Sequence, residues 1–308
     1  MLGAFGGPER LHDDQRAVLE DLGAALYGID LGIAVIEPLS AARFLELEPS
    51  IAGREQAIRL CTIIELLDDA LTTDEARRVD RYAGDIGVRN RFSSEARAIA
   101  EHRAVLLHAD LLRHSWYTEK TVQESLRGRL GELIRSKLSY LGITSDQELA
   151  GRWRALRDLP EGTWGRGVAD FYDRHGFAFP GEPHGIYEIG AHHDFVHVLA
   201  DYEATAEGEL DTFALIAATM EGDEGLSLLA VTLGMFQNGA IRHMLGKRIE
   251  IARSGTLSDP GASPRWADAF RRGAACRYDL LGGIDHFALA PLPLEEARTR
   301  IGLPPAQR

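Results

Sequence analysis

The sequence predicts an all-α protein built from two helical regions, and three observations support this fold class. Apolar residues recur at helical three- and four-residue spacing along most of the chain. We find no convincing run of alternating apolar and polar residues, the pattern of a half-buried strand. The composition, with 45% apolar and 26% charged residues, is that of an ordinary globular protein.

The first region is expected to span residues 1–150 and to consist of amphipathic helices. The 54–71 segment places Ala57, Leu60, Ile64, Leu67 and Leu71 on one face. Thr73 is a suitable N-cap for the next helix, because its hydroxyl can accept a hydrogen bond from the first turn. The expected helices cover residues 13–27, 41–47, 54–71, 74–85, 94–116 and 119–141.

The second region, residues 151–308, contains more proline and glycine. We place the boundary near residue 150, and loops rich in these residues lie at 159–165, 177–185 and 255–264. The expected helices are 147–156, one ending near Gly176, one carrying a histidine cluster, one after residue 205, one at 266–281 and a terminal one starting near 291. The apolar segment 226–236 is expected to be buried, either as ordinary core, which we favour, or as the lining of a pocket for an aromatic or isoprenoid group.

Charge and cysteine usage exclude several classes of protein. A net charge of −13 without a basic stripe argues against nucleic acid as a partner. Cys61 and Cys276 are too few and too distant in sequence for a disulfide framework. Neither a signal peptide nor an uninterrupted apolar span is evident, so we expect a cytoplasmic protein. Walker, Rossmann and nucleophile-elbow motifs are also missing from the sequence.

The most informative segment is 190–197, GAHHDFVH. Four of the eleven histidines, His184, His192, His193 and His197, fall within fourteen positions. His193 and His197 are four residues apart, so they share one helix face, with Asp194 at its edge. Imidazole and carboxylate together suit zinc and other first-row divalent metals. The pattern therefore favours a metal site over two solvent-facing histidines.

Glu209 joins this site only if the helix breaks. On one straight helix, the twelve-residue separation from His197 would place Glu209 about 18 Å away along the axis. Ligands of one ion must lie within a few ångströms of each other, because metal–ligand bonds are about 2.0–2.2 Å long. We therefore expect a break over residues 201–205, with Thr205 as the N-cap of the following helix. The alternative is that Glu209 is a surface charge.

These motifs resemble the ubiquinone-biosynthesis Coq-four family over residues 150–308. HDFVH at 193–197, eleven further residues and Glu209 match its HDxxH-x11-E signature. LPEGTWGRGVADFYDRHGF at 159–177 and RRGAACRYDLLGGIDHFALAPLPLEEARTRIGL at 271–303 are similar to two other family segments. The resemblance implies that four residues bind a divalent metal, zinc foremost, in an all-α fold: His193, Asp194, His197 and Glu209.

The sequence departs from the family pattern beside this motif. It reads Ala200-Asp201-Tyr202-Glu203 where the family usually has Thr-Gly-Tyr-Gly, and Val196 where the family often has tryptophan. We expect a different pocket shape and charge, and hence a substrate other than the long prenylated precursor of ubiquinone.

Residues 57–87 more faintly resemble TerB-like domains. That resemblance implies a carboxylate metal site with Asp68, Asp69 and Asp74 as candidates. We favour the alternative of an acidic helix–helix junction exposed to water, since charge clusters are usually solvated.

Further polar candidates are weaker. His108 and His114 are six apart, on different helix faces, and indicate a polar surface. Asp285-His286 is expected near the end of a helix. We favour an imidazole at the helix C-terminus that the helix dipole stabilises, and the alternative is a proton-transfer pair that reaches the metal pocket. One of three residues is expected to orient a metal ligand: Asp170, Tyr172 or Asp173.

The function these patterns predict is that of a metal-dependent enzyme. The resemblance implies a lyase or oxidoreductase that decarboxylates or hydroxylates an aromatic or quinonoid acid in quinone or natural-product biosynthesis. Asp194 and Glu209 are the expected catalytic residues. The alternative is a non-catalytic scaffold that binds a hydrophobic precursor and organises partner enzymes, with peripheral membrane contact or homo-oligomers as further expectations. Three protein ligands plus an open position would indicate catalysis, and four would indicate a structural ion.

Overall fold

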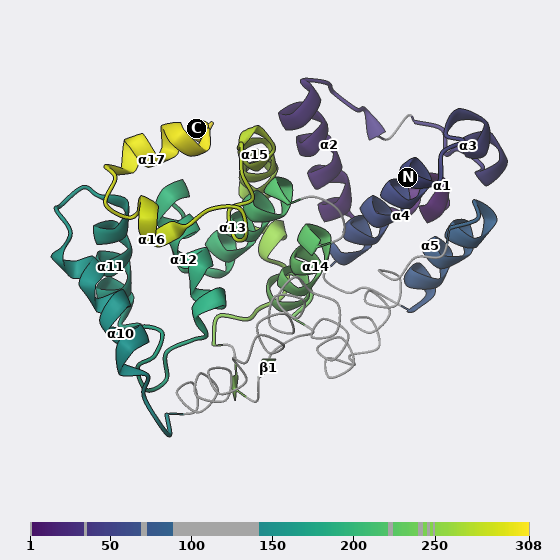
Figure 1. The fold of residues 1–308 in the computed structure, drawn as a ribbon. Helices are drawn as coiled ribbons and strands as arrows, with labels where there is room; N and C mark the ends of the chain where they lie inside the picture. Colours follow the sequence, from purple (N-terminus) through teal and green to yellow (C-terminus); the bar gives the residue numbers. More distant parts are fainter. Residues whose placement is uncertain are drawn as a thin grey trace.

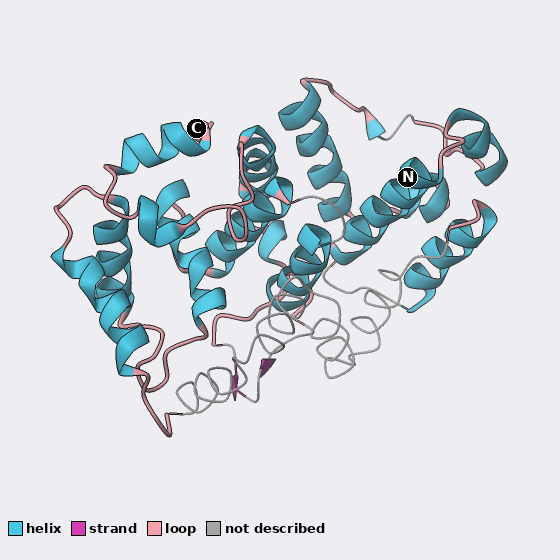
Figure 2. Cartoon of the chain, in the orientation of Figure 1, coloured by secondary structure: helices cyan, strands magenta, loops and turns pink. Residues whose placement is uncertain are grey.

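The computed structural model describes residues 2–33, 36–68, 73–88, 142–220, 224–239, 243–244, 247–248 and 250–307. The predicted all-α fold is confirmed, as Figures 1 and 2 show. Within these residues, strand structure is limited to the antiparallel pair β1 (His243–Met244) and β2 (Lys247–Arg248) and two isolated bridges.

The helices of the N-terminal part follow the predicted order, but one of them begins and ends earlier in the sequence than predicted. The helices predicted over 13–27 and 41–47 have the expected bounds. The one predicted over 54–71 begins earlier because the Ser50 hydroxyl accepts from the Gly53 N–H at 3.1 Å. The elements are α1 (Leu2–Phe5), η1 (Pro8–Arg10), α2 (Asp13–Tyr27), α3 (Ala41–Leu47), α4 (Ile51–Leu66) and α5 (Thr73–Asp85). The helices expected at 94–116 and 119–141 lie outside the described residues.

The C-terminal part contains α10 (Gln147–Arg154), η4 (Ala155–Asp158), α11 (Trp164–His175), α12 (Glu188–Ala200), α13 (Ala206–Thr219), α14 (Glu224–Phe236), η5 (Thr256–Ser258), α15 (Ala262–Ala275), α16 (His286–Leu289) and α17 (Leu294–Ile301). The limits predicted for the helix over 266–281 are wrong. Helix α15 begins at Ala262 and ends at Ala275, because the backbone of Cys276 is extended. Asp285 and His286 lie at the start of a helix, not at the C-terminal end that a dipole-stabilised imidazole would require. Asp285 is the N-cap of α16 and accepts from the Ala288 N–H at 3.0 Å.

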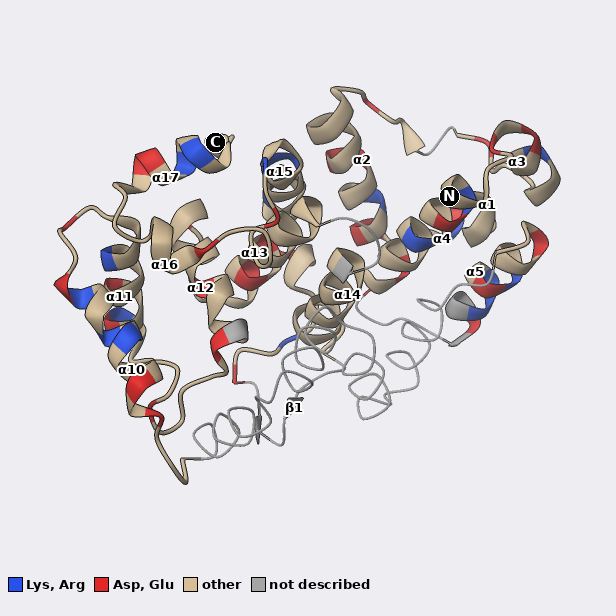
Figure 3. Ribbon diagram, viewed as in Figure 1, with Lys and Arg blue, Asp and Glu red and all other residues tan. Residues whose placement is uncertain are grey.

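Helix α13 lies at the centre of the packing. It contacts α14 and α15, α15 packs against α2, and α14 packs against α4 (Figure 1). Leu229, Leu233 and Phe236 of α14 are buried, which agrees with the favoured core-packing interpretation of 226–236. Figure 3 shows charged residues along α5, α10 and α11, whereas α14 has almost none. None of the described helices combines the length and apolar content that crossing a membrane requires.

Three side-chain amides satisfy the C-terminal carbonyls of α4, which have no partner inside the helix. Gln15 Nε2 donates to the Ile64 carbonyl at 3.0 Å, and Gln237 Nε2 donates to the Leu67 carbonyl at 2.7 Å. Asn238 Nδ2 donates to the carbonyls of Leu66, at 3.2 Å, and Asp68. This amide cluster (Gln15, Gln237 and Asn238) joins α4 to both α2 and the end of α14. The domain boundary near residue 150 stays a prediction.

Candidate metal centre

The predicted break between α12 and α13 is confirmed. Asp201 adopts the left-handed conformation, with φ 63°, and ends α12, while the Thr205 hydroxyl accepts from the Gly208 N–H at 3.2 Å and starts α13. A Cβ at Gly208 would lie 1.8 Å from the Glu203 carbonyl oxygen, so the turn requires glycine there. The two helices therefore fold back on each other, and Glu209 faces α12.

Three predicted ligands meet across this break. Glu209 Oε1 lies 3.4 Å from His197 Nε2, and Glu209 Oε2 lies 3.6 Å from His193 Nε2. The ligand atoms of all three residues lie within 4.8 Å of one another, so this group can hold a metal ion. His197 is fully buried, whereas the side chains of His193 and Glu209 are 16% and 12% exposed. The group thus has one side that approaches solvent.

Both imidazoles are oriented by acceptors behind them. His193 Nδ1 lies 2.5 Å from the Gly190 carbonyl, and His197 Nδ1 lies 3.2 Å from the Tyr202 carbonyl. Because a carbonyl can only accept, each Nδ1 carries the proton in the neutral ring, and each Nε2 lone pair faces the other ligands. Such hydrogen bonds fix the orientation of metal-binding histidines in proteins.

The group also passes a chemical test of fit to a metal ion. His197 Nε2 is buried and has no hydrogen-bond partner, a costly state that a bound ion would relieve. Burial lowers the pKa of His193, but the carboxylates of Asp194 and Glu209 outweigh it and raise that pKa to about 10. Burial raises the pKa of Glu209, but His197 and His193 outweigh it and keep that pKa well below its usual range. Two imidazoles and a carboxylate match the ligands of zinc and related metals.

Asp194 lies beside this group and is held differently. Its Oδ1 is 3.4 Å from His193 Nε2, whereas its Oδ2 accepts from the Tyr172 hydroxyl at 2.5 Å. Burial raises its pKa, partly opposed by the two histidines. The group whose ligand atoms all lie within 4.8 Å of one another consists of His193, His197 and Glu209. Asp194 as a fourth ligand therefore stays a prediction.

Aromatic rings cover two of the ligands. Phe171 of α11 stacks on His197 with ring centroids 5.5 Å apart, and Phe213 of α13 stacks on His193 at 5.2 Å. The Thr212 hydroxyl lies 3.2 Å from His197 Nδ1. We did not predict these three residues. Thr212 and Phe213 follow Glu209 by three and four positions, so helical spacing alone could have placed them on its face.

Donors from distant segments hold the carbonyls of α12. Trp164 Nε1 donates to the Phe195 carbonyl at 2.8 Å. Near the helix end, Arg298 Nε donates to the Leu199 carbonyl at 2.8 Å, and Arg272 Nη1 donates to the Ala200 carbonyl at 3.1 Å. Two cations at a helix C-terminus also complement its dipole. The ligand-bearing helix is therefore fixed from outside.

The remaining polar candidates near α12 have other contacts. Of the three residues expected to orient a ligand, Tyr172 reaches the site, while Asp170 pairs with Arg166 and Asp173 with Arg157. His286 is buried, its Nε2 lies 2.8 Å from the Leu280 carbonyl, and its ring stacks on His192.

The two described candidate carboxylates of the N-terminal part have different partners and different exposure. Asp68 is buried, 3.2 Å from His12 Nε2, whereas Asp74 is exposed and pairs with Arg77. The expected water-exposed junction is therefore wrong for Asp68, because packing against α2 covers it. Asp69, His108 and His114 lie outside the described residues.

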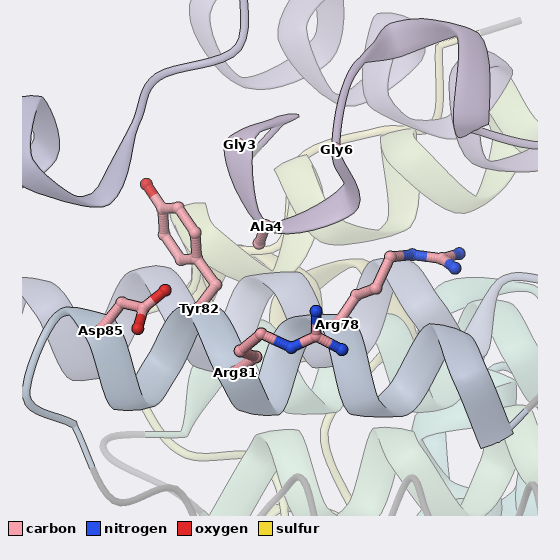
Figure 4. Close-up of a pocket in the computed structure, with 7 residues that line it drawn as sticks. All are labelled: Gly3, Ala4, Gly6, Arg78, Arg81, Tyr82 and Asp85. Atoms are coloured by element: carbon pink, nitrogen blue, oxygen red, sulfur yellow. The ribbon is translucent and has the colours of Figure 1, made fainter.

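A separate small pocket lies between α1 and α5 (Figure 4), away from α12 in Figure 1. Arg78, Arg81, Tyr82 and Asp85 of α5 line it together with three residues of the N-terminal segment. The Tyr82 hydroxyl donates to the Leu39 carbonyl at 3.2 Å. The packing of the N-terminal segment against α5 accounts for this pocket, and we assign no ligand to it.

Comparison with family models and with curated proteins finds no match for this chain. The resemblance of residues 150–308 to the Coq-four family therefore stays an expectation from the sequence motifs alone.

Proposed function

We propose that this protein is a metal-dependent enzyme that binds one divalent ion, zinc foremost, through His193, His197 and Glu209. The observation that carries the proposal is the convergence of these three side chains, with both Nδ1 atoms turned to carbonyls and both Nε2 atoms turned inward. Three protein ligands are typical of catalytic zinc sites, where the remaining position takes water or substrate.

The surroundings of the site favour a flat, acidic substrate. A bound ion supplies a Lewis acid that stabilises negative charge on a carboxylate or phenolate oxygen. Phe213 adds an aromatic face against the partly exposed His193. With the motif resemblance, these features support an aromatic or quinonoid acid as substrate and decarboxylation or hydroxylation as the reaction. Asp194 and Glu209 are the carboxylates available to take up a proton.

Metal content tests the first part of the proposal. Purified protein is expected to hold about one divalent ion per chain, and His193→Ala and His197→Ala are each expected to lose it. His184→Asn is the matched control, because His184 is exposed in the loop before α12 and its positive φ suits asparagine. Full metal content in both alanine variants would remove the assignment.

Glu209→Gln tests the second part. The substitution keeps size but weakens the ligand and removes the base. An enzyme is expected to lose turnover of aromatic and quinonoid acids by about 10²–10⁴-fold, with little change in melting temperature. Undiminished product formation by a fully folded variant would instead favour the scaffold function.

A further inference from the structure

Tyr172 is a buried phenol fixed by the rings around it. It belongs to α11 and is 1% exposed. Its ring stacks on Phe179 with centroids 4.7 Å apart, and the rings of Trp153 and Phe177 lie 5.8 Å away. Rings packed on three sides leave the phenol little freedom to turn, so the position of its hydroxyl is set by the core rather than by solvent.

That hydroxyl gives the two oxygens of Asp194 different roles. Oδ2 accepts from the Tyr172 O–H at 2.5 Å, a short hydrogen bond typical of a carboxylate acceptor. Oδ1 is the oxygen that lies toward the metal ligands, 3.4 Å from His193 Nε2. The side chain of Asp194 is itself almost completely buried. Its orientation is therefore set by Tyr172 at Oδ2 and by His193 at Oδ1.

We propose that Tyr172 is a positioning residue of the metal centre. It holds Oδ2, so that only Oδ1 of Asp194 could reach an ion held by His193, His197 and Glu209, and the carboxylate could not bind that ion through both oxygens. This inference rests on the proposed metal binding. Its consequence is that a coordination position beside His193, His197 and Glu209 stays open to a small ligand from solution.

Loss of the phenolic hydroxyl releases this constraint. In Tyr172→Phe the ring packing is kept, but Oδ2 has no donor and the carboxylate can turn both oxygens toward the ion. We expect a higher coordination number, weaker binding of an added ligand such as azide by about tenfold, and a metal affinity changed by about tenfold or more.

Cobalt(II) alone is the probe, because its visible absorption reports coordination geometry. The matched control is Tyr82→Phe, which removes a phenol outside the metal centre, one that donates to the Leu39 carbonyl at 3.2 Å. Wild type and Tyr82→Phe are expected to share one spectrum and one azide affinity. Tyr172→Phe is expected to show weaker, shifted absorption. An unchanged spectrum and unchanged affinities in folded Tyr172→Phe would overturn the proposal.

A second variant keeps the test decisive if Tyr172→Phe does not fold. Asp194→Asn has only one oxygen, which the Tyr172 hydroxyl occupies, so it presents an amide nitrogen to the ion. We expect a changed cobalt spectrum in this single variant. A wild-type spectrum in Asp194→Asn would overturn the inference. Failure of wild-type protein to bind cobalt would instead refute the proposed function itself.

Discussion

The amide cluster at the end of α4 and the metal centre between α12 and α13 are both buried polar groups at helix ends, but they differ in how those groups are satisfied. In the amide cluster, neutral donors reach the carbonyls at hydrogen-bond distances. In the metal centre, His197 Nε2 has no hydrogen-bond partner, and Glu209 lies 3.4 Å or more from both imidazoles. The difference separates a cluster whose donors complete the end of a helix from a group of side chains that could hold a metal ion.

The largest effect is expected in the amide cluster. Gln237→Ala removes the donor to the Leu67 carbonyl and the acceptor of the Leu257 N–H. Leaving two buried groups without partners is expected to cost about 3–5 kcal/mol of the free energy of unfolding. Urea denaturation measures this. Gln147→Ala on the surface is the control and should have little effect. Zinc stoichiometry should not change, and its loss would show that the two regions are coupled.

Gly208→Ala tests whether the metal centre depends on the helix break. The new Cβ would meet the Glu203 carbonyl, so the turn must open, at a cost of about 2–3 kcal/mol and with weaker metal binding. Gly151→Ala is the matched control, because a Cβ at that helical position meets nothing within 4 Å. It should be neutral or stabilising by up to about 1 kcal/mol. Equal metal affinity in both variants would contradict the role of the break.

The pH dependence of zinc binding distinguishes the metal centre from a neutral cluster. With the pKa of His193 raised from 6.5 to about 10, its proton stabilises the metal-free fold fully below pH 6.5, and this contribution is lost as pH rises toward 10. Zinc must displace that proton. Between pH 7 and 8.5 we expect zinc affinity to rise about tenfold per pH unit, or about 1.4 kcal/mol.

Calorimetry in two buffers of different ionisation enthalpy measures the protons released at pH 8, where we expect about one. His184→Asn, which leaves the three ligands in place, is the control and is expected to release the same number of protons as wild type. A zinc affinity that does not change with pH would contradict the assignment of His193 as a ligand.

The smallest effect is expected at Asp201. Its φ of 63° is strained for most side chains, although aspartate tolerates it better than most. Asp201→Gly is expected to stabilise the fold by about 0.5 kcal/mol, and Asp201→Ala to destabilise it by about 1 kcal/mol. Thermal unfolding of the three proteins gives the order. Alanine ranking above aspartate would show that the turn is not maintained in solution.

The parts predicted from sequence were those fixed by spacing along one chain segment. The four-residue separation of His193 and His197, and the distance that a straight helix would impose on Glu209, were enough to predict the break. The limits of α4 and α15 were wrong, because a cap at Ser50 and an early extended residue at Cys276 outweighed the apolar periodicity.

Contacts between segments were harder to predict. Phe171 stacks on His197 from another helix, and Gln237 reaches α4 across 170 residues of sequence. Tyr172 was one of three candidates, and only packing could show which side of α11 faces α12. Such contacts depend on how helices pack, which periodicity within one segment does not specify.

The arginines that hold the end of α12 have a consequence for the order of assembly during synthesis. Arg272 and Arg298 follow their carbonyl partners by 72 and 99 residues. A growing chain thus exposes the HDFVH segment well before the residues that anchor its helix have been made. Helix α12 consequently remains unanchored at its C-terminal end until α15 and α17 emerge, so the final geometry of the three candidate ligands forms late in biogenesis.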